Sequence, residues 1–140
     1  MSDASREKAA MTLTPYARSL GIEVEDSSAD APTLAIDFSR NIEGRPSHFH
    51  GGATAGLLEA AGYAILRVTL DAEERKPILK PVNITVQYLS AGKQKRTYAQ
   101  GRITRLGRRN ANITVEAWQD DRSRPIATAV MNILMAEPKA

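Results

Sequence analysis

Apolar and polar residues alternate through most of the second half of the chain, a pattern typical of β-strands with one buried face. Between 82 and 89, for example, Val82, Ile84 and Val86 alternate with polar residues. The pattern predicts strands at 82–89, 95–106, 112–117 and 125–136, with turns between them at Ala91–Gly92, Leu106–Arg108 and Asp120–Asp121. The last stretch is apolar almost throughout, which predicts burial on both faces or at a subunit contact.

The first half predicts one short helix, two strands and one long helix. Residues 6–19 have the apolar spacing of an amphipathic helix, with Pro15 in its first turn or breaking it, and Gly21 ending it. Residues 1–5 are expected to be frayed. Alternation then predicts strands at 21–26 and 32–38, before a polar loop with Gly and Pro at 39–50.

Residues 51–70 form the long helical pattern, with no proline inside it. At 100° per residue, one face collects an apolar stripe of Thr54, Leu57, Leu58, Ala61, Ala64, Ile65 and Val68. The opposite face is also small or apolar, and Glu59 is the only charged residue in 51–66. A helix that is apolar all round is buried all round, so we expect Glu59 to be enclosed in the protein or at an interface.

The order of helix, two strands, long helix and four strands predicts an α+β fold in which one antiparallel sheet curls around a central helix. A chain of 140 residues fits a single domain over 1–140. With no cysteine, disulfides and cysteine-based metal or nucleophile sites are excluded. No secretory signal and no run of about 18 apolar residues is present, so we expect a cytoplasmic protein without a membrane partner.

The net charge of +3 is concentrated in one segment. Residues 93–109 contain Lys93, Lys95, Arg96, Arg102, Arg105, Arg108 and Arg109 and no acidic residue. Such a block suits an anionic partner, although it could equally be a solvated strand face. One Trp, four Tyr and two Phe leave little for stacking on bases, so nucleic acid is not expected and a small polyphosphate ligand fits.

Glu59 is the candidate catalytic group. Desolvation raises the pKa of a buried carboxylate and makes it a better base near neutral pH. The alternative is a structural Glu that pairs with an arginine or reaches the edge of the helix. Gly51 and Gly52 begin the helix, where free backbone N–H groups and the positive end of the dipole could stabilise an oxyanion. Because Glu59 lies about 12 Å further along the axis, two antiparallel chains would have to share the site.

The loop before the helix offers two histidines. His50 and His48 could orient or polarise a substrate, or could anchor the loop. Two histidines and one distant Glu lack the spacing of a zinc motif, so no metal site is expected.

The segment HGGATAGLLE, from His50 to Glu59, resembles the HGG-x6-Glu/Asp signature of hotdog-fold thioesterases of the phenylacetate-degradation type. Its Glu is most similar to the branch that hydrolyses aromatic acyl-CoA thioesters. The segments TPYARSLGIEV, VNITVQYLSAG and ITRLGRRNANITVEAWQDDRSRPIATAVM also resemble that family, so the likeness covers about residues 12–136.

The resemblance implies a hotdog fold, with five or six antiparallel strands wrapped around one long helix, and homodimers that often form homotetramers. It implies an acyl-CoA hydrolase without a metal or redox cofactor, coenzyme A being part of the substrate. The Gly51 N–H would hold the thioester carbonyl, and Glu59 would act across the dimer as general base or nucleophile. Basic side chains of the 93–109 block would meet the CoA phosphates.

This sequence departs from the family pattern at two positions. The family usually has Asn or Gln six residues before the histidine, where Gly44 stands here, and Asn41 or His48 would take that role. The Glu branch often has Ser or Thr four residues after the carboxylate, where Tyr63 stands. We therefore expect Asn41, His48, Gly52 and Tyr63 to contact the substrate.

Two other functions remain open on the sequence. A hotdog-fold dehydratase or hydratase for acyl thioesters also pairs a His with a carboxylate, although with a different spacing. A non-catalytic acyl-CoA-binding module would bind without turnover. A serine hydrolase is excluded because the chain has no GxSxG elbow.

Overall fold

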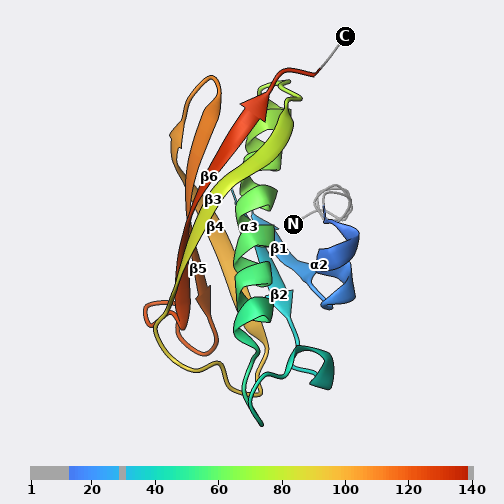
Figure 1. The fold of residues 1–140 in the computed structure, drawn as a ribbon, viewed down its shortest axis with the longest axis vertical. Helices are drawn as coiled ribbons and strands as arrows, with labels where there is room; N and C mark the ends of the chain where they lie inside the picture. Colours follow the sequence, from blue (N-terminus) through green and yellow to red (C-terminus); the bar gives the residue numbers. More distant parts are fainter. Residues whose placement is uncertain (1–12, 29–30, 139–140) are drawn as a thin grey trace.

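The computed structural model describes residues 13–28 and 31–138, in which a six-stranded antiparallel sheet lies against one long helix (Figure 1). The helices are α2 (Pro15–Ser19), the 3-10 turn η1 (Arg40–Ile42) and α3 (Gly51–Ala72). The strands are β1 (Glu23–Ser28), β2 (Ala31–Ile36), β3 (Ile78–Tyr88), β4 (Thr97–Leu106), β5 (Asn110–Trp118) and β6 (Ala127–Ala136). The expected α+β hotdog fold is thereby confirmed, with six strands.

The order of strands across the sheet is β1-β2-β4-β5-β6-β3, and all neighbours are antiparallel. β3 follows α3 in the chain but pairs with β6, the last strand. It is therefore an edge strand, and among the described strands only β6 pairs with it.

The predicted apolar stripe of α3 is the face that packs on the sheet. Leu57, Leu58 and Ala61 are fully buried there. Leu66 and Leu70, which lie on the opposite side of the helix near the direction of Glu59, are also fully buried. Close approach of helix and sheet requires a glycine on β4, because a Cβ at Gly101 would lie 2.8 Å from the Ile65 side chain and 3.2 Å from the Ala61 carbonyl oxygen. Burial of this stripe is the main source of stability for the helix.

The C-terminal end of α3 is closed by a Schellman motif. The Arg75 N–H donates to the Leu70 carbonyl at 2.9 Å, and the Glu74 N–H donates to the Asp71 carbonyl at 3.1 Å. Glu74 takes the left-handed conformation, with φ of 56°. Glu74 thus occupies the left-handed position of the motif, where glycine is the usual residue.

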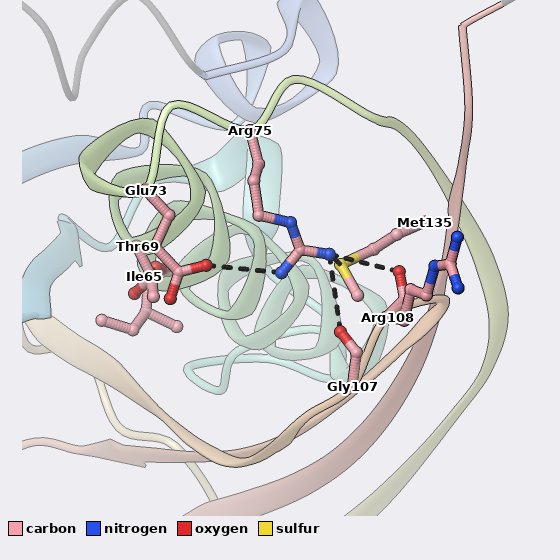
Figure 2. A network of polar contacts seen from close by, with 7 residues as sticks. All are labelled: Ile65, Thr69, Glu73, Arg75, Gly107, Arg108 and Met135. Atoms are coloured by element: carbon pink, nitrogen blue, oxygen red, sulfur yellow. Dashed lines mark hydrogen bonds and ion pairs between the residues drawn. The ribbon is translucent and has the colours of Figure 1, made fainter.

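Arg75 ties this end of α3 to the turn between β4 and β5 (Figure 2). Its guanidinium donates to the carbonyl oxygens of Arg108 at 3.2 Å and Gly107 at 3.5 Å, and it pairs with Glu73 at 3.3 Å. Figure 2 also shows the Met135 sulfur beside the same guanidinium, which brings the end of β6 into the contact. The C-terminal end of α3 is thus held by the β4–β5 turn and by the end of β6.

Most predicted elements are present, with shifted ends. Thr14 caps α2 by accepting the Ala17 N–H at 3.1 Å, Pro15 lies in its first turn, and Gly21 follows with φ of 86°. The frayed residues 1–5 and the first part of the predicted 6–19 helix lie outside the described residues. β3 begins at Ile78, earlier than expected, because its backbone pairs with β6 on both sides of a register shift near Pro81.

For residues 125–136 the first predicted alternative, burial on both faces, is wrong for the single chain, and the second, a subunit contact, stays a prediction. Along β6 the inner side chains are buried and the outer ones are only partly covered, and Val130 is 51% exposed. The outer face includes the polar Thr128 and Asn132, and the face toward α3 is the one that meets the core.

Candidate active site

The start of α3 presents one unpaired backbone donor. His50 is the N-cap, and its Nδ1 accepts the Gly52 N–H at 2.9 Å. The N–H groups of Ala53 and Thr54 donate to the His50 carbonyl. No group among the described residues accepts the Gly51 N–H, and Gly51 is exposed. Because the helix dipole is positive here, this N–H suits a developing negative charge.

The loop before α3 folds back on η1. The His50 N–H donates to the Ile42 carbonyl at 2.7 Å, and Glu43 bridges Phe49. Asn41 therefore directly precedes Ile42, the residue that is hydrogen-bonded to the helix N-cap, and the Asn41 side chain is exposed. Gly44 is needed in this loop because a Cβ there would lie 2.9 Å from the His50 Cα.

The two histidines have different contacts. His50 caps the helix, as described above, whereas the ring of His48 lies 2.9 Å from the Pro46 carbonyl oxygen, within its own loop. The observed contact of His48 corresponds to the loop-anchoring interpretation. His50 instead sets the geometry of the helix start.

Glu59 is exposed in the single chain, which contradicts the expectation that α3 is covered on all sides. The sheet covers only one face of the helix, and α2 covers part of the other near Gly56, where a Cβ would lie 2.9 Å from the Leu20 side chain. The Glu59 face is small and apolar, and among the described residues α2 and Leu79 of β3 border it. The described part of the chain leaves this carboxylate open to solvent.

Glu59 lines a cleft of about 350 Å³ between α2 and α3. The residues around it include Leu13, Thr14, Ala17, Glu59, Tyr63 and Arg67. Tyr63 is half-buried, one turn after Glu59. Burial raises the pKa of the Tyr63 phenol above its usual range, and the negative charge of Glu59 raises it further. The phenol therefore stays protonated and can donate a hydrogen bond.

Two residues of this region were not singled out from the sequence. Arg67, two turns beyond Glu59, enters the same cleft, and its helical spacing from Glu59 could have indicated this. Tyr88, at the end of β3, donates from its hydroxyl to the Gly51 carbonyl at 2.8 Å. Nothing local in the sequence points to that contact, because it depends on the path of β3.

Gly51 and Glu59 are not brought together within one chain. They lie eight residues apart on the same straight helix, about 12 Å along its axis. A single thioester carbonyl cannot meet both groups of one chain.

The basic side chains of residues 93–109 do not form one continuous patch on the surface. Lys95 pairs with Asp120, and Arg96 pairs with Glu23, Glu25 and Asp37 at 2.6–3.0 Å. Because β4 is an extended strand, Arg105, Arg108 and Arg109 lie far from these pairs, around the β4–β5 turn. Five cations of the block have no ion pair within the described part of the chain, namely Lys93, Arg102, Arg105, Arg108 and Arg109.

Within residues 13–28 and 31–138, no three acidic or histidine side chains gather in a way that could hold a metal ion. No helix in this part is both long and apolar enough to cross a membrane.

A six-stranded antiparallel sheet wrapped on one long helix, with a free amide donor at the helix start, defines the hotdog class of enzyme folds. Residues 47–126 match the family model of the thioesterase superfamily, and the chain belongs to that superfamily. Among curated proteins, none matches the chain.

Solved structures with the same fold cover nearly the whole chain. A protein from Chromobacterium violaceum is 27% identical, with a TM-score of 0.73, and the match covers 97% of this chain and 93% of that one. A phenylacetic acid degradation-related protein from Ralstonia eutropha is 19% identical, with a TM-score of 0.76 and coverage of 94% and 98%. A thioesterase from Haemophilus influenzae is 14% identical, with a TM-score of 0.83 and coverage of 94% and 90%.

Proposed function

We propose that the protein hydrolyses acyl-CoA thioesters to the free acid and CoA, as a homodimer of the phenylacetate-degradation type with Glu as its carboxylate. The observation that carries this is the Gly51 N–H, which no described residue accepts, at the start of a 22-residue helix whose cleft beside α2 holds the exposed Glu59. The first is a donor for an oxyanion, and the second is a base or nucleophile. Thioesterase superfamily membership supports the same chemistry.

The reaction follows from these two groups. The thioester carbonyl oxygen accepts the Gly51 N–H of one chain, which makes the carbonyl carbon more electrophilic. Glu59 of the other chain takes a proton from water, and the resulting hydroxide adds to that carbon. When the tetrahedral intermediate collapses, the C–S bond breaks and the CoA thiolate leaves, taking up the proton that Glu59 removed from water. In the direct variant, Glu59 itself adds to the carbon, the C–S bond breaks and releases the CoA thiolate, and water then hydrolyses the acyl-carboxylate anhydride to the free acid and Glu59.

The edge strand β3 supports a dimer. Six large hydrophobic side chains are notably exposed among the described residues, and five of them lie on β3, just after it, or beside it on β6: Ile78, Val82, Tyr88, Leu89 and Val130. An unpaired, apolar edge is a surface that proteins normally cover. Pairing of two β3 edges would extend the sheet and set two α3 helices side by side, as the shared site requires.

The CoA phosphates would contact basic side chains that have no carboxylate partner. Lys95 and Arg96 are already held in ion pairs, so the available groups are Lys93 and the arginines of β4 and its following turn.

The experiment is thiol release from a panel of acyl-CoA thioesters. We expect turnover by the wild type and a loss of about 100-fold or more in Glu59→Ala and Glu59→Gln. Glu137→Gln, an exposed carboxylate after β6, serves as the matched control. Formation of an enoyl product without thiol release would indicate a dehydratase or hydratase. Thermal stabilisation by acyl-CoA without turnover would indicate a binding module.

A mixing experiment tests the shared site. Gly51→Pro removes the donor N–H and introduces a residue that is favoured at the first position of a helix. His50 already has the extended backbone that a residue before proline adopts, with φ −65° and ψ 133°. Each variant alone, Glu59→Ala or Gly51→Pro, should be inactive. A mixed dimer holds one intact pair only if Gly51 and Glu59 come from different chains, so recovered activity supports the shared site and its absence contradicts it.

A further inference from the structure

The cleft beside Glu59 has a charge at each end and an apolar wall between them. Glu59, Tyr63 and Arg67 follow one another at successive turns along one line of α3. Leu13 and Ala17 form part of the facing wall, and both are buried. Among the described residues that line this cleft, Glu59 and Arg67 are the only charged ones.

In the part of the chain that the structure describes, Arg67 has no ion-pair partner. It is half-buried, and no carboxylate of the described residues lies within ion-pair distance of it. Arg75, eight residues further along the chain, is instead held by Glu73 and two carbonyl oxygens (Figure 2). A guanidinium partly withdrawn from water without an anion lacks the interaction that normally offsets its lost hydration.

From this arrangement we propose that Arg67 determines substrate specificity by binding a carboxylate at the distal end of the acyl group, so that the preferred substrates are acyl-CoA thioesters of dicarboxylic acids. The inference rests on the proposed thioesterase function and on the cleft being the acyl pocket. Glu59 repels a second negative charge near the thioester, and Arg67 attracts it two turns away. Tyr63, protonated between them, can donate a hydrogen bond to the same group.

The spacing sets a length for the acyl group. Eight residues of helix span about 12 Å, and helical side chains lean toward the N-terminus, so an acyl chain of about six to eight carbons brings its end to the guanidinium. A four-carbon diacid is too short to reach it from a carbonyl near Glu59.

The test compares acyl-CoA pairs of equal length that differ only in the terminal carboxylate: octanoyl with octanedioyl, hexanoyl with hexanedioyl, and butyryl with succinyl. For the two longer pairs we expect the wild type to have a higher kcat/KM with the diacid, and no such gain with succinyl-CoA. Arg67→Gln should lower kcat/KM for the long diacids by about 10- to 100-fold, the scale of hydrogen bonds to a charged group. It should change the neutral substrates less than about threefold, and Arg124→Gln, an exposed control in the β5–β6 turn, should change neither class.

Other roles of Arg67 give different results. If Arg67 contacts the CoA phosphates, Arg67→Gln should lower kcat/KM equally for diacid and neutral acyl-CoA substrates, and should not lower it for N-acetylcysteamine thioesters. That result would overturn the proposal. A role only at a subunit contact predicts equal losses with a changed oligomer size, which would also overturn it. If Arg67→Gln does not fold, the salt dependence of the wild type still tests the proposal. Its preference in kcat/KM for the long diacids should weaken as salt is added, and a salt-independent preference would overturn the proposal. Loss of octanoyl-CoA hydrolysis in Glu59→Gln shows whether the thioesterase mechanism holds, independently of any diacid preference.

Discussion

The hydroxyl of Tyr88, at the end of β3, donates a hydrogen bond to the carbonyl oxygen of Gly51, the first residue of α3, at 2.8 Å. The Tyr88 ring also packs close to Gly51, because a Cβ at Gly51 would lie only 3.4 Å from it. The contact joins the edge strand to the helix start that presents the proposed oxyanion donor. We therefore propose that Tyr88 positions Gly51.

Tyr88→Phe should reduce activity without unfolding the protein. It removes one exposed hydrogen bond and keeps the ring, so we expect kcat to fall by about three- to tenfold, as one hydrogen bond of about 1 kcal/mol allows. KM should change less than kcat. The control is Tyr98→Phe, whose hydroxyl has no hydrogen-bond partner within the described residues. Equal kcat values for Tyr88→Phe and wild type would show that Gly51 needs no such support.

His50 should be replaceable by another helix-capping residue. His50→Ala removes the acceptor for the Gly52 N–H and should lower the free energy of unfolding by about 1 kcal/mol, whereas His50→Asn restores an acceptor and should stay near wild type. Urea unfolding measures both. We expect thiol release to follow the same order. A stable but inactive His50→Asn would mean that the imidazole itself touches the substrate.

Glu74→Gly should stabilise the protein. Glu74 occupies the left-handed position of the Schellman motif, where a side chain costs about 1 kcal/mol that glycine avoids. We expect the free energy of unfolding to rise by about 0.5–1 kcal/mol, with unchanged activity. Glu73→Gly, one residue earlier with φ of −91°, is the matched control and should not stabilise the fold. A destabilised Glu74→Gly would show that the side chain contributes more than its backbone strain costs.

Tyr63 should make stability fall at alkaline pH. Because the pKa of its phenol is raised in the folded state, the unfolded chain loses this proton first, at the ordinary value near 10.0. The contribution is thus fully present below pH 10 and is lost as the pH rises through the folded-state pKa. Urea unfolding between pH 8 and 11 should show a smaller alkaline loss in Tyr63→Phe than in wild type. Parallel curves for the two proteins would contradict the assigned shift.

The fold could be predicted largely from the sequence because each element has a regular pattern. The α3 stripe from Leu57 to Ile65 and the alternation in β5 specify buried faces by spacing alone. The exposure of Glu59 could not be predicted this way. Its neighbours are small and apolar, and a sequence does not distinguish a face covered by the same chain from one left open to another.

The site was predicted only where its residues are neighbours in the chain. Gly51, Gly52 and His50 form the helix start as expected, because capping depends on local backbone geometry. The contact of Tyr88 with Gly51 and the entry of Leu13 into the cleft depend on how β3 and α2 pack. The division of the basic block likewise follows from the pairing of Arg96 with carboxylates that precede α3 by many residues.

The strand order has a consequence for how the protein is made. β3 leaves the ribosome soon after α3, yet its pairing partner β6 is the last strand of the chain. During synthesis both edges of β3 therefore stay open until translation is nearly finished, because its only ladder in the described sheet is with β6. A nascent chain that stalls before Ala127 exposes a long apolar strand without a neighbour, and such chains should depend on chaperones or be degraded rather than accumulate.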